Sequence, residues 1–123
     1  MLGKGCLFTM SECIFCRIAA GELSADIVHE DDRVMVFKDT SPQAPIHFLL
    51  IPKRHISTLL ELGEEDGGLL THIITVLGRV AKEYDLDKKG FRTVINTGEE
   101  GGQTVGHLHF HLLGGRHMQW PPG

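Results

Sequence analysis

The residues best suited to chemistry in this chain are three histidines that alternate with apolar residues over His107 to Leu113. In a β-strand, successive side chains point to opposite faces, and residues two positions apart lie roughly 6 to 7 Å from each other. The alternation therefore predicts a strand with His107, His109 and His111 on one face and apolar side chains on the other. An imidazole titrates near neutral pH and offers an unprotonated nitrogen, so it can act as a nucleophile, an acid, a base or a metal ligand.

Three interpretations of this strand compete. Packing in the core would require hydrogen-bond partners for each buried imidazole. A metal site is the second, because two histidines at i and i+2 of a strand can both ligate zinc or iron. The third is a nucleophilic or acid–base histidine with two helpers, and the preceding loop, residues 96–106, favours it. Its four glycines let backbone amides approach an anion, although such a loop can also be an ordinary flexible connection.

A second candidate feature is the segment Cys13-Ile14-Phe15-Cys16. A lone Cys-x-x-Cys at the start of a helix can be half of a zinc site, a redox pair, or two small buried residues. The sequence lacks the βαβ pattern that a thioredoxin-like redox pair requires. With Cys6 the chain has three cysteines, which cannot all pair internally, so we expect a reducing compartment and no disulfide framework.

The elements that must position these residues follow from turn signals and apolar periodicity. We expect α+β architecture with a mainly antiparallel sheet. Ser11 is the expected N-cap of the first helix, and His29 and His72 are expected to be exposed to solvent. The predicted elements are a short helix over 11–20, a hairpin of 27–30 and 33–37, strands at 47–51, 91–96 and 107–113, and an amphipathic helix over 64–84.

Length and charge limit the function. A chain of 123 residues with 41% hydrophobic content fits one domain with one core. The formal charge of −4 argues against nucleic acid as a partner, and no stretch approaches the roughly 20 apolar residues of a membrane span. The start of the chain is too short for a secretory signal. We therefore expect a cytoplasmic protein with a disordered stretch or extension over residues 1–10 and a single domain over 11–123.

The segment from Gly101 to Leu113 resembles the His-φ-His-φ-His-φ-φ motif of the histidine-triad (HIT) superfamily. The segments Asp39 to Pro45, His47 to Ser57 and Leu113 to Gly123 are similar to its Hint branch. The resemblance implies a HIT-like fold: a five-stranded, mainly antiparallel sheet with one long and one or two short helices. It also implies a homodimer that continues the sheet, with the C-terminal tail, residues 114–123, contributing to the dimer and the active site.

The resemblance further implies a purine nucleoside phosphoramidase, a hydrolase that cleaves the P–N bond of adenosine or guanosine 5′-phosphoramidates without a catalytic cofactor. His109, the middle histidine, would attack the α-phosphorus and form a nucleotidyl-imidazole that water hydrolyses. His107 would orient it, His111 and His47 would line the phosphate site, and the Thr104 hydroxyl would lie near the leaving group. Nucleotidyl transferases carry Gln at the position of His111, so hydrolysis is favoured over transfer.

Nucleotide-binding residues are also implied by position. Asp39 would accept both ribose hydroxyls, Asn96 would lie near phosphate and ribose, and Trp120 would influence the choice of leaving group. For Phe15 and Ile18, ordinary core packing is an equal alternative, and Lys38 and Thr40 depart from the His and Ile of animal members. The purine would be surrounded by Phe15, Ile18, Leu23, Phe37, Lys38 and Thr40, and the backbone of Gly102, Gln103, Thr104 and Val105 would bind the phosphate.

Some bacterial members of the superfamily hold structural zinc, and here the matching ligands are Cys13, Cys16, His55 and His107. Such a Cys₂His₂ site would be closed and tetrahedral. The alternatives to a phosphoramidase are a dinucleoside polyphosphate hydrolase or other nucleotide hydrolase of the superfamily, a metallohydrolase, and a nucleotide-binding scaffold with vestigial activity. The tail seen here is absent from the dinucleoside polyphosphate hydrolases.

Overall fold

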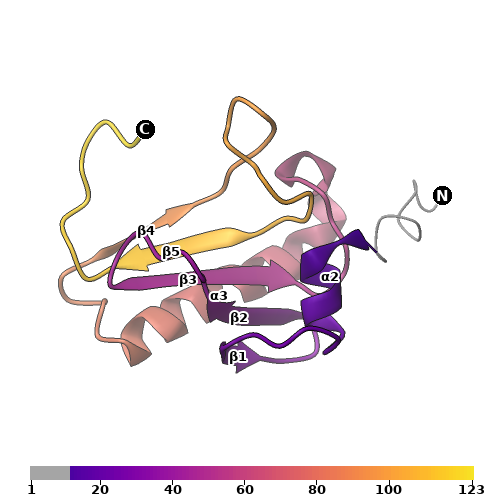
Figure 1. Ribbon diagram of the computed structural model, residues 1–123, viewed down its shortest axis with the longest axis horizontal. Helices are drawn as coiled ribbons and strands as arrows, with labels where there is room; N and C mark the ends of the chain where they lie inside the picture. Colours follow the sequence, from indigo (N-terminus) through magenta and orange to yellow (C-terminus); the bar gives the residue numbers. More distant parts are fainter. Residues whose placement is uncertain (1–11) are drawn as a thin grey trace.

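A computed structural model describes residues 12–123 (Figure 1), so the expected extension over residues 1–10, together with Ser11, lies outside the described residues. The five strands form one sheet in the order β1-β2-β3-β5-β4, and every pair is antiparallel. The predicted five-stranded antiparallel sheet with one long helix is therefore confirmed. The strands are β1 (Ile27–Glu30), β2 (Val34–Lys38), β3 (Ile46–Pro52), β4 (Phe91–Val94) and β5 (Phe110–Gly114).

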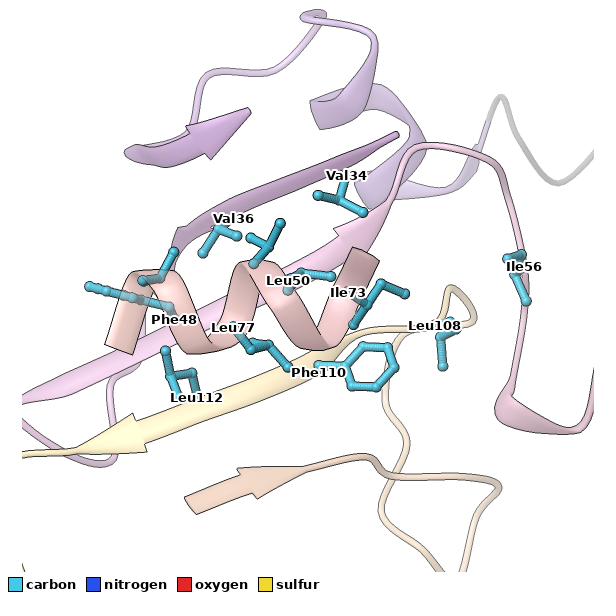
Figure 2. Close-up of a cluster of buried hydrophobic side chains, with 12 residues drawn as sticks. Val34, Val36, Phe48, Leu50, Ile56, Ile73, Leu77, Leu108, Phe110 and Leu112 are labelled. Atoms are coloured by element: carbon cyan, nitrogen blue, oxygen red, sulfur yellow. The ribbon is translucent and has the colours of Figure 1, made fainter. Parts of the chain in front are cut away.

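The long helix α3 (Gly67–Glu83) covers one face of this sheet, and the short helix α2 (Ile14–Ala19) packs on the other. Because side chains alternate along each strand, the two faces have separate cores. Figure 2 shows the core under α3, where Leu108, Phe110 and Leu112 join residues of β2, β3 and the helix. The core under α2 contains Phe15, Ile18, Met35, Phe37, Leu49 and Ile51. The apolar residues between the histidines thus face α3, as the alternation predicts.

Helix α3 follows a short 3-10 turn, η2 (Glu64–Asp66), so the α-helix begins at Gly67 and not at the expected Glu64. The carboxylate of Asp66 accepts hydrogen bonds from the Gly63 amide at 2.9 Å and the Arg54 guanidinium at 2.8 Å. Both bonds hold its pKa below the ordinary value, the Arg54 bond most strongly. The buried side of the helix carries Ile73, Val76, Leu77 and Val80. Burial of each such side chain stabilises the fold by about 1.5–3 kcal/mol.

Other predicted boundaries also differ from the structure. Helix α2 begins at Ile14, because Cys13 is its N-cap and accepts a hydrogen bond from the Cys16 amide. Strand β4 ends at Val94, before the glycine-rich loop, and not at Asn96. Strand β5 begins at Phe110, so His107 and His109 precede the ladder and only His111 lies within it.

The late start of β5 has a specific cause on its partner strand. Phe110 pairs with Leu50, and continuing that register would place Leu108 opposite Pro52. Proline has no N–H to donate, so the ladder ends there. The amide of Leu108 instead donates to the carbonyl of Ile56 at 2.6 Å. The segment 55–57 therefore takes the place of a neighbouring strand beside residues 107–109, the histidine segment.

The expected solvent exposure of His29 and His72 is also wrong. Their side chains are only 20% and 21% exposed, and their Nε2 atoms lie 2.8 and 2.7 Å from the same carboxylate oxygen of Asp31. The other oxygen of Asp31 accepts the amides of Arg33 and Val34 and closes the β1–β2 hairpin. Burial alone raises the pKa of Asp31, but these hydrogen bonds outweigh it and hold the pKa far below its usual range. This cluster ties the hairpin to α3.

Among residues 12–123, none of the helices is both long enough and apolar enough to cross a membrane.

Candidate active site

His109 lies immediately before β5, on the α2 side of the sheet, and is 6% exposed. Its Nδ1 is 2.8 Å from the main-chain oxygen of His107. A carbonyl oxygen only accepts, so Nδ1 carries the proton and Nε2 keeps its lone pair. The ring of Phe15 packs edge-on against this imidazole with centroids 5.1 Å apart. The packing and the hydrogen bond together fix one tautomer and one orientation, with Nε2 as the available nucleophilic atom.

A chain of hydrogen bonds sets the tautomers of the two neighbouring histidines. The amide of Gln43 donates to Nδ1 of His47 at 2.9 Å, so the proton of neutral His47 is on Nε2. That Nε2 lies 2.9 Å from Nδ1 of His111 and 3.4 Å from a carboxylate oxygen of Asp39. Nδ1 of His111 is then the acceptor, and its Nε2 carries a proton. His111 is thereby prepared to donate a hydrogen bond, whereas His109 is prepared to attack.

Burial keeps these imidazoles neutral. Burial, followed by the nearby rings of His109 and His47, lowers the pKa of His111 to about 4, although Asp39 opposes the change. Burial also lowers the pKa of His47, again against the effect of Asp39. Near pH 7 both are therefore neutral donors, which agrees with the hydrogen-bond chain. The rings of His47 and His109 each lie 5.1 Å from the ring of His111, centroid to centroid.

His107 belongs to a different group of side chains. Its Nε2 lies 2.8 Å from the Pro52 carbonyl, so the proton is on Nε2 and the unprotonated Nδ1 faces the cysteine pair. Nδ1 is 3.4 Å from Sγ of Cys13 and 3.5 Å from Sγ of Cys16, and Cys16 Sγ is 3.1 Å from Nδ1 of His55. Burial, opposed by the Pro52 bond, lowers the pKa of His107 to about 4.

The four ligand atoms of Cys13, Cys16, His55 and His107 lie within 4.8 Å of one another. In a tetrahedral zinc site with bonds of about 2.3 Å to sulfur and 2.0–2.1 Å to nitrogen, a sulfur and a nitrogen ligand lie about 3.6 Å apart. The observed distances of 3.1 to 3.5 Å are close to that edge length. The hydrogen bond from His107 to Pro52 is also the kind of outer contact that orients a ligating imidazole. The donor set and geometry fit zinc.

The glycine-rich loop borders a pocket of about 460 Å³ whose lining includes Gly102, Gln103, Thr104 and Val105. The Gln103 side chain does not face this pocket freely: its Nε2 donates to the carbonyls of Ser57 at 2.8 Å and Val105 at 3.0 Å. Its oxygen accepts the Gly98 amide at 3.0 Å. Gln103 therefore braces the loop with its side chain. Its main-chain amide donates to the Gly98 carbonyl at 3.0 Å, and the Gly102 amide donates to the Glu99 carbonyl at 3.1 Å. Of the four predicted anion-binding positions, Thr104 and Val105 are the ones whose amides do not close this loop.

Asn96 has a similar role at the start of this loop. Its side-chain Nδ2 donates to the carbonyl of Gly101 at 2.7 Å, which leaves Oδ1 for other contacts. Gly101 fits only as glycine, because a Cβ there would overlap the main-chain oxygen of Thr97. Thr104 is exposed at the edge of the pocket. The loop is thus held in one shape by side chains at both ends.

The residues expected around the purine separate into two groups. Phe15, Ile18 and Phe37 are at most 9% exposed and belong to the core under α2, so the alternative of core packing holds for Phe15 and Ile18. Leu23 is partly buried against that core. The outer group is exposed: Lys38 pairs with Asp26 at 3.5 Å, Thr40 faces solvent, and the indole of Trp120 is 81% exposed.

Asp39, the predicted ribose acceptor, is partly buried at the end of β2. One carboxylate oxygen accepts the Ser41 amide at 2.7 Å, and the other lies near His47. The sequence interpretation missed Gln43, which acts through its main-chain amide. A backbone donor has no residue type associated with it, so no motif signals this contact.

Comparison with known proteins agrees with this geometry. Residues 12–120 match the protein family described as scavenger mRNA decapping enzyme C-term binding. The chain is 53% identical to an uncharacterised HIT-like protein of Synechococcus elongatus over 115 residues. The aligned region covers 93% of this chain and 100% of that protein. The chain belongs to the histidine-triad (HIT) family. The superfamily resemblance of the triad segment is thereby confirmed.

Solved HIT structures have the same fold. A HIT family hydrolase from Legionella pneumophila superposes with a TM-score of 0.89 and 47% identity, covering 90% of this chain and 99% of that chain. A histidine triad protein from Clostridium difficile gives a TM-score of 0.85 and 44% identity, covering 88% and 94%.

In this HIT protein a second set of possible ligand atoms, from Asp39, His47 and His111, also gathers within 4.8 Å. The Gln43 amide occupies Nδ1 of His47, so the proton of the neutral ring is on Nε2, where a metal would have to bind. This set therefore suits hydrogen bonding and proton transfer better than metal ligation. The cysteine cluster, formed by Cys13, Cys16, His55 and His107, suits a metal because Nδ1 of His107 is unprotonated.

Proposed function

We propose that this chain hydrolyses the P–N bond of purine nucleoside 5′-phosphoramidates through a covalent nucleotidyl–His109 intermediate. The observation that carries the proposal is the hydrogen bond from His109 Nδ1 to the His107 carbonyl at 2.8 Å, which leaves Nε2 unprotonated. A donor, Nε2 of His111, is prepared on the adjacent ring. The similarity to solved HIT family hydrolases from Legionella pneumophila and Clostridium thermocellum supports hydrolysis as the reaction class.

The proposed reaction has two displacements at phosphorus. Nε2 of His109 forms a bond to the α-phosphorus while the P–N bond breaks, and the departing nitrogen takes a proton from solvent beside the Thr104 hydroxyl. Water then attacks phosphorus and releases a proton to solvent, the bond to Nε2 breaks with its electron pair returning to the ring, and the nucleoside monophosphate leaves. The His107 carbonyl stabilises the positive charge on the modified ring. Nε2–H of His111, with the amides of Thr104 and Val105, stabilises the negative charge on the phosphoryl oxygens.

The nucleotide would lie across the end of the sheet, with its ribose hydroxyls on Asp39 and its base over Leu23, Lys38 and Thr40. The buried rings of Phe15 and Phe37 would support this surface from below. The Hint-like tail supports amines as leaving groups, with Trp120 acting in the partner's site. This assignment favours phosphoramidates over dinucleoside polyphosphates.

The test is rapid quenching in alkaline denaturant, in which a nucleotidyl-histidine P–N bond persists, during turnover of a phosphoramidate labelled in the nucleotide. We expect label on His109 in the unmodified protein and none in His109→Gln, whereas the exposed His117→Gln should trap as the unmodified protein does. A panel of amine, acyl and polyphosphate leaving groups defines the substrate class. Turnover without trapped label, or equal rates for His109→Gln and the unmodified protein, would contradict the mechanism. Loss of activity in excess chelator while one zinc per chain is retained at the cysteine cluster would favour a metallohydrolase.

We also propose a structural Zn²⁺ ion held by Cys13, Cys16, His55 and His107. The support is the tetrahedral spacing of the four ligand atoms and the tautomer of His107. When bound, zinc would fix the start of α2 to the histidine segment. Protein purified without chelator should contain one zinc per chain. A content far below that value would contradict the site.

A homodimer that continues the sheet is the third part of the proposal. Within residues 12–123, no strand pairs with the outer edge of β4, where Phe91 and Ile95 are 41% and 39% exposed. An unpaired apolar edge is suited to strand pairing with a second copy. Light scattering should give a mass of twice 13.6 kDa. The mass of a single chain at micromolar concentration would exclude the dimer.

A further inference from the structure

The turn after β5 is docked against the loop that precedes β3. The Nε atom of Arg116 donates a hydrogen bond to the Gln43 carbonyl at 3.0 Å. Next to it, Gly115 has a φ of 92° and lies so close to Pro45 that an added Cβ would be 2.9 Å from the proline Cβ. The pairing of Ile46 with Gly114 brings these two segments together at the end of the sheet. The start of the C-terminal tail is therefore in direct contact with loop 41–45.

Loop 41–45 in turn holds His47. The main-chain amide of Gln43 donates to Nδ1 of His47 at 2.9 Å, while its side chain donates to the Ser41 carbonyl at 3.0 Å. Gln43 is thus held at both main-chain groups: Arg116 binds its carbonyl and His47 binds its amide. A displacement of the carbonyl would displace the amide, because both belong to one residue between Pro42 and Pro45, where the backbone has little freedom.

The amide of Gln43 decides where His47 carries its proton. While Nδ1 accepts from an N–H, it cannot be protonated without placing two N–H groups against each other. His47 then donates through Nε2 to Nδ1 of His111, and the proton of His111 remains on Nε2. The charged or titratable side chains that face His47 are Asp39, at 3.4 Å, and His111.

We propose that Arg116 is a positioning residue: through its hydrogen bond to the Gln43 carbonyl it fixes the tautomers of His47 and His111. The first residues of the tail thereby help to determine which nitrogen of His111 faces the phosphate. The catalytic meaning of this role rests on the proposed function. The tautomers themselves are a property of the ligand-free protein and do not depend on the substrate.

The test is imidazole NMR of nitrogen-labelled, ligand-free protein, which distinguishes protonated from unprotonated ring nitrogens. In the unmodified protein both His47 and His111 should be protonated on Nε2 alone. In Arg116→Ala we expect mixed tautomers for both rings and an upward shift of the His47 titration midpoint. Single Nε2 tautomers and an unchanged midpoint in Arg116→Ala would overturn the proposal.

Two further variants separate the hydrogen bond from charge and from loosening of the tail. Arg116→Lys keeps the charge but lacks the Nε donor, so we expect the tautomers to be mixed there too. Arg92 is the matched control, because its guanidinium binds another tail carbonyl, that of Gln119, at 2.9 Å and does not touch Gln43. Arg92→Gln should leave both tautomers unchanged. Mixed tautomers in Arg92→Gln, or pure ones in Arg116→Lys, would overturn the specific role of Arg116.

Kinetics connect the tautomers to the reaction. With an adenosine phosphoramidate, Arg116→Ala should lower kcat about tenfold, while KM changes less than about twofold. The tenfold loss is smaller than the roughly 10²–10⁴-fold that a positioned acid–base group contributes. If Arg116→Ala alters the tautomers but the unmodified protein does not cleave phosphoramidates, the proposed function is refuted and the role of Arg116 is not. If the tautomers are unaltered in Arg116→Ala and the unmodified protein cleaves phosphoramidates, the role of Arg116 is refuted and the proposed function is not.

Discussion

The main-chain oxygen of His107 accepts a hydrogen bond from Nδ1 of His109 at 2.8 Å, while the ring of His107 faces the sulfur atoms of the cysteine pair. One residue therefore connects the cysteine cluster to the proposed nucleophile. The connection is rigid because Nε2 of the same ring is bound to the Pro52 carbonyl. Order in the cysteine cluster should consequently determine the orientation of the His109 ring.

Removing the nucleophilic ring is expected to abolish turnover but not binding. His109→Ala should lower kcat for a phosphoramidate by at least about 10³-fold, since loss of a nucleophile removes the covalent route. Nucleoside monophosphate affinity, measured by calorimetry, should change little because Asp39 and the loop amides remain. His117→Ala, a change at an exposed histidine, should retain full activity. Comparable rates in the two variants would contradict the role of His109.

Loss of the cysteine cluster should reduce both metal content and stability. Cys16→Ser is expected to release zinc and to lower the free energy of unfolding by about 4 kcal/mol, the value for a ligand present at about 1,000 times its Kd. Cys6→Ser, a change at the remaining cysteine, should alter neither quantity. Zinc content by mass spectrometry and urea unfolding are the measurements. Equal stability of the unmodified protein with and without chelator would argue against a structural metal.

Stability should fall in mild acid because buried histidines must accept protons on unfolding. The pKa of His111 is lowered from 6.5 to about 4 by burial first and by the nearby rings second. A histidine with a depressed folded-state pKa contributes stability that is complete above the unfolded value and is lost as the pH falls through the folded value. The urea midpoint should therefore decrease between pH 6.5 and 4, and less steeply in His111→Gln. Parallel pH dependence in both proteins would exclude His111 as a contributor.

The carboxylate of Asp31, which binds two histidines, is expected to contribute strongly to the stability of the fold. Asp31→Ala removes four hydrogen bonds at once, from His29, His72 and two hairpin amides, and should destabilise the protein by about 2 kcal/mol. Asp32→Ala, at the adjacent exposed position, should cost less than about 0.5 kcal/mol. Thermal or urea unfolding would compare the two. Similar midpoints would show that the cluster does not stabilise the hairpin.

Two glycines with positive φ allow backbone strain to be separated from steric contact. Gly115→Ala should cost more than the roughly 1 kcal/mol of an unfavourable φ, because its Cβ would also displace Pro45. Gly21 has a φ of 79° with nothing within 4 Å of an added Cβ, so Gly21→Ala measures the strain alone. Unfolding free energies should differ between the variants. Equal losses would mean that Pro45 moves aside without cost.

The elements dominated by local periodicity were predictable from the sequence. The alternation in the histidine segment placed its apolar residues in the core under α3, and the three- and four-residue spacing located that helix to within one turn. The end of the β5 ladder was not predictable, because it depends on Pro52 lying opposite Leu108 in a register set by the whole sheet. His29 and His72 were misjudged for the same reason: Asp31 and His72 are distant in sequence and meet only in the folded chain.

The candidate site shows the same division. Residue types and spacing selected the three histidines and the cysteine pair, whereas the resemblance to the HIT superfamily supplied His47 and the possible zinc ligands His55 and His107. The fold brings His47, His109 and His111 together, and likewise the four possible zinc ligands. Tautomers were beyond the sequence because they are set by main-chain groups: the carbonyls of His107 and Pro52 and the amide of Gln43. The bracing roles of Gln103 and Asn96 depend on the closed shape of the loop, which its glycines permit but do not specify.

Because β5 begins only at Phe110, the proposed nucleophile is held by other contacts than those of a strand in the sheet. His107 to His109 are held by the bond from Leu108 to Ile56 and by side chains, and not by neighbouring strands. The amides of His107 and His109 lie outside the ladder and should exchange with solvent faster than those of β3. Because Leu108 is packed in the core under α3 and His107 is bonded to the Pro52 carbonyl, tertiary contacts on both sides of the sheet anchor the proposed nucleophile.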